Sequence, residues 1–178
     1  MRGRLWQGKE ALLDALQVFV SNYKRNIFEL SATDKAAFTP AQIVQACTTE
    51  CKKRNRDYKK EALNCLASVL NSFDQVIQLY NEYKFDVFES LKDMLLQIAS
   101  GEAEQEEDEE EKKSSDKISP AELECRGKAF RCLALAYNRA DDAAVVNSLL
   151  DFFVAQHQIQ EWPVKSEILV AFKVRSKS

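Results

Sequence analysis

The segment WQGKEALLDALQVFV, residues 6–20, decides the fold class. Its apolar side chains recur at intervals of three, four and seven residues, which is the spacing of one face of an α-helix. The segment therefore predicts a helix over about residues 6–27. We expect this helix to bury one apolar stripe, made of Leu12, Ala15, Leu16, Phe19 and Val20.

Two helix starts of a common pattern stand further along the chain. The segments TPAQ at residues 39–42 and SPAE at residues 119–122 each place a hydroxyl at the N-cap, proline at N1 and glutamine or glutamate at N3. This pattern is typical of a capping box. Gly101 has the position of a C-terminal cap. With the apolar periodicity, these signals predict about seven helices, over about residues 6–27, 40–51, 58–73, 75–100, 120–137, 142–157 and from 162 onward.

The same spacing predicts which side chains these helices bury. The expected inner faces are Ile43, Cys47 and Cys51; Ala62, Leu66, Val69, Leu70 and Phe73; Leu79, Tyr83, Phe88, Leu91, Leu95 and Ile98; Leu123, Phe130, Leu133, Ala134 and Tyr137; Val145, Leu149, Phe152 and Phe153; and Ile168, Leu169 and Phe172.

Composition supports an all-α chain. Only four glycines and three prolines occur in 178 residues, about a third of their usual combined frequency. This scarcity argues against β-sandwiches, Rossmann folds and P-loop folds, which need glycine at tight turns and phosphate loops. Apolar residues make up 46% of the chain, which is ample for a core, and charged residues make up 30%.

A weak internal repeat favours a helical array. Trp6, Lys9, Leu12-Leu13 and Ala15-Leu16 align with Trp162, Lys165, Ile168-Leu169 and Ala171-Phe172. We expect a HEAT or armadillo-like α-solenoid segment with helix pairs at about 40–73, 76–137 and 142–175. A four-helix bundle is the competing architecture.

The predicted layout is HEAT-like helices over 1–100, an acidic disordered loop over 101–119, and helices over 120–178 that continue the same solenoid. Both terminal helices lack a capping partner, so we expect a segment of something longer.

The acidic loop, residues 101–119, carries nine acidic residues and three lysines. It has almost no apolar side chain to bury and so cannot offset its ordering entropy. We expect a solvated spacer, with a basic partner surface as the alternative.

Six basic residues lie close together at the junction of the second and third predicted helices. They are Lys52, Lys53, Arg54, Arg56, Lys59 and Lys60. Such a cluster is compatible with a nuclear localisation signal, an RNA contact or a dock for an acidic partner. A solvated turn between helices is the more usual explanation of such a cluster. We keep these six residues as the candidate partner contacts.

No catalytic or metal site can be assembled from the sequence. The single histidine, His157, stands near a helix end, where the helix dipole favours it. Cys47, Cys51, Cys125 and Cys132 fall on or near apolar stripes, where a free cysteine behaves as a small hydrophobe. We therefore expect no enzyme activity, no cofactor and no small-molecule substrate.

Five cysteines without a regular framework indicate a reducing compartment, and no apolar run is long enough to span a membrane. The prediction is a cytoplasmic and nuclear protein.

Three blocks of sequence resemble a known family. They are GRLWQGKEALLDAL at 3–16, IVQACTTECK at 43–52 and ALNCLASVL at 62–70, and the similarity returns at Trp162. The first block is similar to a helix-opening motif near the C-terminal end of the large HEAT-repeat proteasome-associated adaptor and scaffold family. The resemblance implies a non-catalytic scaffold that binds the core and regulatory particles of the 26S proteasome and contributes to its assembly, stability or quality control. It offers no catalytic motif.

Two other functions use the same architecture. A karyopherin-type nuclear-transport adaptor is suggested by the acidic loop and the basic cluster. An RNA-binding helical repeat is suggested by the basic cluster alone, although the chain lacks the dense basic face usual in nucleic-acid binding.

Overall fold

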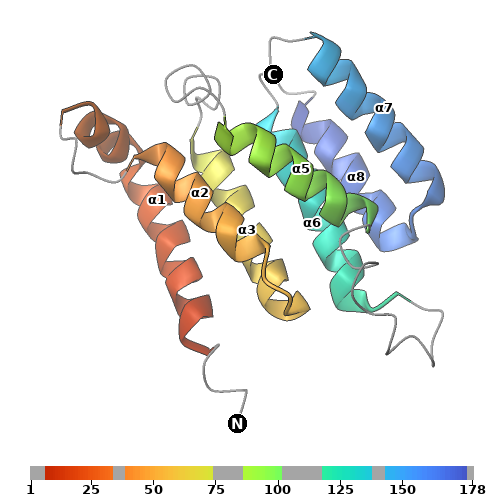
Figure 1. The fold of residues 1–178 in the computed structure, drawn as a ribbon, viewed down its shortest axis with the longest axis horizontal. Coiled ribbons are helices and arrows are strands. Elements are labelled where there is room, and N and C mark those ends of the chain that lie inside the picture. Colours follow the sequence, from red (N-terminus) through yellow and green to blue (C-terminus); the bar gives the residue numbers. More distant parts are fainter. Residues whose placement is uncertain (1–6, 34–38, 74–85, 102–117, 138–142, 176–178) are drawn as a thin grey trace. The chain divides into compact units, whose positions relative to one another are not determined.

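The computed structural model describes residues 7–33, 39–73, 86–101, 118–137 and 143–175, and these contain seven α-helices and no strand. The helices form two compact units, Met1–Glu89 and Ser90–Ser178. Figure 1 shows α1, α2 and α3 side by side in the first unit. In the second unit α8 lies against α6, and α7 contacts α8. The predicted all-α class is confirmed, and the described residues hold the seven helices that the sequence led us to expect.

Helix α1, Gln7–Thr33, is longer than expected and buries a different face. Tyr23 has non-helical backbone angles (φ −117°, ψ 18°), which kinks the helix. The buried side chains are Leu13, Val20 and Ile27, spaced seven apart, and they lie on the side that contacts α3. Of the predicted stripe only Val20 is buried. Leu12, Ala15 and Phe19 are exposed and Leu16 is half-buried, so the prediction was wrong for this face.

Helices α2, Pro40–Cys51, and α3, Arg56–Ser72, form the core of the first unit with α1. The predicted capping box is present: the Gln42 backbone N–H donates to Thr39 Oγ1 at 3.2 Å, and the Thr39 backbone N–H donates to Gln42 Oε1 at 2.9 Å. The predicted inner faces of both helices are confirmed as buried. They are Ile43, Cys47 and Cys51 on α2, and Ala62, Leu66, Val69, Leu70 and Phe73 on α3 and its C-terminal cap.

Helices α5, Asp86–Ser100, and α6, Pro120–Ala136, follow the expected pattern where they are described. Gly101 ends α5 with φ at +81°, the left-handed conformation that favours glycine. Ser119 caps α6, accepting from the Glu122 backbone N–H at 3.3 Å. The inner faces are confirmed for Leu91, Leu95, Ile98, Leu123, Phe130, Leu133, Ala134 and Tyr137. Leu79, Tyr83, the Phe88 side chain and most of the acidic loop lie outside the described residues.

Helices α7, Ala143–Ile159, and α8, Trp162–Arg175, meet α6 through a cluster of aromatic rings. The ring centre of Phe130 lies 5.6 Å from that of Phe152 and 5.2 Å from that of Phe153, and Phe153 lies 5.6 Å from Phe172. Leu149, Phe153 and Ile168 are buried as predicted, and Val145, Phe152 and Phe172 are half-buried. Leu169 is exposed, which contradicts its predicted place in the core.

A polar network fixes the end of α5 against the other helices of the second unit. Gln160 Nε2 donates to the Ala99 carbonyl at 3.4 Å and to Gln156 Oε1 at 2.6 Å. Arg126 donates to Gln160 Oε1 at 3.4 Å and pairs with Glu122 one turn earlier on α6. The network gives a C-terminal carbonyl of α5 a side-chain partner, which a buried helix end requires.

Among the described residues, none of the helices combines the length and the apolar character needed to cross a membrane.

Candidate partner-binding surface

The basic cluster lies on the tight connection between α2 and α3. Lys52 follows the last residue of α2, and Arg56 is the first residue of α3. Asn55 is the N-cap of α3, and its side chain accepts from the Tyr58 backbone N–H at 2.9 Å. Two backbone hydrogen bonds close the end of α2, from the N–H of Lys52 to Thr49 and from that of Lys53 to Glu50. The connection is therefore a capped turn with a fixed course.

The six candidate residues differ in accessibility. Lys52 and Arg54 are exposed, and Lys53, Arg56 and Lys60 are half-buried. Lys59 is only 8% exposed and belongs to the inner part of α3. Lys60 also lies 3.9 Å from a carboxylate oxygen of Glu61, its neighbour on α3. A partner approaching the turn from solvent meets Lys52 and Arg54 first.

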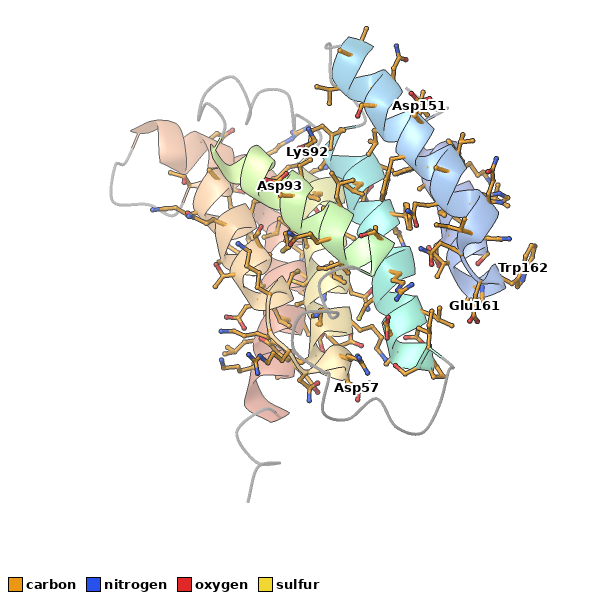
Figure 2. The ribbon with its side chains drawn as sticks, turned by 45° about the vertical axis from the view of Figure 1, so that its right-hand side comes forward. Asp57, Lys92, Asp93, Asp151, Glu161 and Trp162 are labelled. Carbon is orange, nitrogen blue, oxygen red and sulfur yellow. The ribbon has the colours of Figure 1, made fainter. Side chains whose placement is uncertain are left out.

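Tyr58 links the two helices on either side of the turn. Its hydroxyl donates to Glu50 Oε2 at 2.7 Å, which joins the last turn of α2 to the first turn of α3. Burial raises the pKa of Tyr58 above its ordinary value, and the hydrogen bond to Glu50 adds to the shift. The phenol therefore stays protonated and keeps donating. Figure 2 labels Asp57, the residue before Tyr58 in the first turn of α3.

The cysteines of the first unit lie in its core. Cys47, Cys51 and Cys65 are all buried thiols outside any disulfide, and the Sγ atoms of Cys47 and Cys65 are 3.9 Å apart. Hydrogen bonding with Cys47 lowers the pKa of the Cys65 thiol, while burial opposes the shift. Within the part of the chain that the structure describes, no group of three or more histidine, cysteine or acidic side chains is arranged to hold a metal ion. His157 is half-buried in the last turn of α7.

Each unit also has one exposed apolar face, and the sequence analysis had placed Leu12, Phe19 and Leu169 of these faces in the core. The α1 outer face consists of Leu12, Phe19 and Tyr23, with the rings of Phe19 and Tyr23 5.3 Å apart. The α8 outer face consists of Trp162, Leu169 and Val170. In Figure 2 the Trp162 ring points away from the helices around it. Large apolar side chains exposed in groups are typical of surfaces that contact other molecules.

Comparison with known proteins places the chain in a family. Residues 32–172 match the family described as ECM29, C-terminal ARM-like repeats. The chain belongs to this family. The match runs from the end of α1 to α8 and contains the whole basic turn. It confirms the armadillo-like class that the internal repeat predicted, and the resemblance recognised in the three sequence blocks.

A curated relative is the human protein named "Proteasome adapter and scaffold protein ECM29". It is 29% identical to this chain over 139 residues, which is 78% of this chain and 7% of the relative. The chain thus spans a small part of that protein. No solved structure matches the chain.

Proposed function

We propose that this chain is a non-catalytic adaptor and scaffold segment that binds the 26S proteasome and contributes to its assembly, stability or quality control. The observation that carries the proposal is the family match over residues 32–172, together with the printed name of the human relative. The chain then acts where proteasomes act, in the cytoplasm and the nucleus. Catalysis is not required, because a scaffold works by holding surfaces in place.

The exposed part of the basic turn is the proposed electrostatic contact. Lys52 and Arg54 are exposed on a turn that is capped at both ends. Because the backbone of the turn is already ordered, binding a partner there loses little conformational entropy. Exposed charges of this kind mainly speed association and select partners of opposite charge. We therefore propose that the turn meets an acidic patch on a proteasome subunit, whereas Lys59 contributes only to the fold.

Affinity capture with quantitative mass spectrometry tests this proposal. The tagged full chain, immobilised in lysate at physiological salt, is expected to enrich proteasome core and regulatory subunits over a tag-only control. Lys52→Glu combined with Arg54→Glu is expected to reduce that enrichment severalfold. Arg25→Glu combined with Arg131→Glu is the matched control, because both arginines are exposed and lie on other helices.

The outcomes separate the candidate functions. Equal loss in the two double variants would mean that overall charge, and not the turn, governs capture. Enrichment of a transport GTPase without proteasomes would instead support the nuclear-transport adaptor. Retention of RNA that falls with salt and with the turn variant would support the RNA-binding repeat.

A further inference from the structure

Two buried thiols from neighbouring helices are in contact in the core of the first unit. Cys47 lies on α2 and Cys65 on α3, and these helices lie side by side in Figure 1. Their Sγ atoms are 3.9 Å apart although the residues are 18 apart in sequence, and their exposed fractions are 1% and 0%. The S–S bond of a disulfide is about 2 Å long. The two sulfurs are therefore a small side-chain movement away from bonding distance.

The other cysteines are buried as well, but they are placed differently. Cys125 and Cys132 lie seven residues apart on α6 in the other unit. Their Cα atoms are about 10 Å apart along the helix, whereas a disulfide requires less than about 7 Å. Cys51 lies one turn after Cys47 on the same face of α2. Burial alone does not distinguish Cys47 and Cys65 from these residues, but their contact across two helices does.

The hydrogen bonds of Cys65 favour its oxidation before that of Cys47. The Cys65 thiol donates to the Leu13 carbonyl of α1 at 3.5 Å, and its Sγ is in hydrogen-bond contact with Cys47. Hydrogen bonding with Cys47 lowers the pKa of Cys65, against the opposing effect of burial. The thiolate is the form of cysteine that attacks an oxidant. Once Cys65 is oxidised, Cys47 is already in place to react with it.

We propose that Cys47 and Cys65 are a redox modification site, at which hydrogen peroxide forms a disulfide between α2 and α3. The Cys65 thiolate attacks one peroxide oxygen and the O–O bond breaks, giving a sulfenic acid and a hydroxide that takes up the proton lost by Cys65. The Cys47 sulfur then attacks the Cys65 sulfur, the S–O bond breaks, and a second water leaves with the Cys47 proton. Two thiols thus lose two electrons and two protons, and one peroxide becomes two waters.

The bridge closes a loop that contains the whole basic turn, because all six basic residues lie between Cys47 and Cys65. It ties α2 to α3 and removes the proton that Cys65 donates to Leu13 of α1. In the cytoplasm and the nucleus thiols are kept reduced, so a bridge there is a transient and reversible state. The chemistry uses only core residues of the first unit, so it does not depend on proteasome binding.

Disulfide mapping of the full chain, folded and unfolded, tests the proposal. The dilute, reduced chain is treated with a small molar excess of hydrogen peroxide, with or without urea, and the remaining thiols are then alkylated in urea. Trypsin cleaves after Lys52 and Lys60, so Cys47 and Cys65 fall in different peptides that only a bridge can join. Fragmentation of the joined peptides in the mass spectrometer distinguishes Cys47 from Cys51.

The folded chain is expected to form the Cys47–Cys65 bridge at least about tenfold more than any other pair, because these sulfurs are already in contact. A dithiol reductant is expected to remove the bridge. In urea, where the contact is lost, a mixture of pairs is expected. The same mixture in the folded chain would overturn the proposal, and so would folded chain whose thiols are oxidised singly or not at all.

Cys47→Ala and Cys51→Ala are matched variants, because each removes one buried thiol from the same face of α2. Far-UV circular dichroism checks that both keep their helical content. Oxidation is expected to raise the thermal unfolding midpoint of the wild type and of Cys51→Ala by several degrees, and to leave that of Cys47→Ala unchanged. A bridge to Cys65 that survives in Cys47→Ala and is lost in Cys51→Ala would overturn the proposal. The mapping of the wild type decides the question without either variant.

Discussion

Phe130 and Phe19 offer the sharpest test of how this chain divides its apolar residues between core and surface. Sequence periodicity assigns both phenylalanines to buried stripes. The structure leaves Phe130 with no exposed surface and Phe19 half exposed. The substitutions Phe130→Ala and Phe19→Ala remove the same atoms from these two environments, so the difference in their effects reports the difference in burial and packing.

Removal of the Phe130 ring is expected to cost about 3–5 kcal/mol of unfolding free energy, the usual range for a buried phenylalanine. The cavity opens beside Phe152 and Phe153, whose ring centres lie 5.6 and 5.2 Å away, so two aromatic contacts are lost with the buried area. Phe19 loses one exposed contact with Tyr23 and partial burial. Its removal is expected to cost about 1 kcal/mol or less.

Urea unfolding followed by far-UV circular dichroism distinguishes the two variants. With a slope of about 2 kcal/mol per molar urea, Phe130→Ala is expected to lower the midpoint by about 2 M, and Phe19→Ala by less than about 0.5 M. Equal midpoint shifts for the two variants would refute the assignment of Phe19 to the surface.

Three further substitutions probe single contacts. Thr39→Ala removes the N-cap of α2 and is expected to cost about 1 kcal/mol in urea unfolding, while Thr39→Ser restores most of it. Gly101→Ala places a Cβ at φ +81° and against the Arg126 guanidinium, so a loss of more than about 1 kcal/mol is expected in the same assay; an unchanged midpoint would show that the end of α5 is not held as described. The raised pKa of Tyr58 means that the folded state holds this proton more tightly than the unfolded state. Its contribution to stability is therefore complete below the ordinary tyrosine pKa of about 10 and is lost as pH rises above it. Tyr58→Phe is therefore expected to lose less stability than the wild type as pH rises above about 10. Thermal unfolding of both proteins across alkaline pH measures the difference.

Local signals predicted the helices and several of their ends. The hydroxyl, proline and glutamine of residues 39–42 form the expected capping box because all its hydrogen bonds lie within four residues. Gly101 adopts the positive φ expected of a C-terminal glycine. The Asn55 cap was missed, although an asparagine directly before α3 is a usual N-cap signal.

Periodicity could not predict which apolar side of a helix is packed against a neighbouring helix. A stripe such as that of Leu12 and Phe19 shows that a helix has an apolar side, but not whether another helix reaches it. In α1 the neighbouring stripe of Leu13 and Val20 meets α3 instead. Burial of Lys59 within a basic cluster likewise depends on the packing of α3, which no local pattern records. The expected layout of the acidic loop, and of 120–178 as a continuation of the same array, stays a prediction.

Direct binding to purified 26S proteasome tests the central claim most simply. The full chain and the proteasome are mixed at physiological salt and separated on a density gradient, with the Lys52→Glu and Arg54→Glu double variant run in parallel. The account predicts that wild-type chain comigrates with the proteasome in a saturable amount and that the double variant comigrates severalfold less. A folded, helical wild-type chain that stays at the top of the gradient at every proteasome concentration would contradict it.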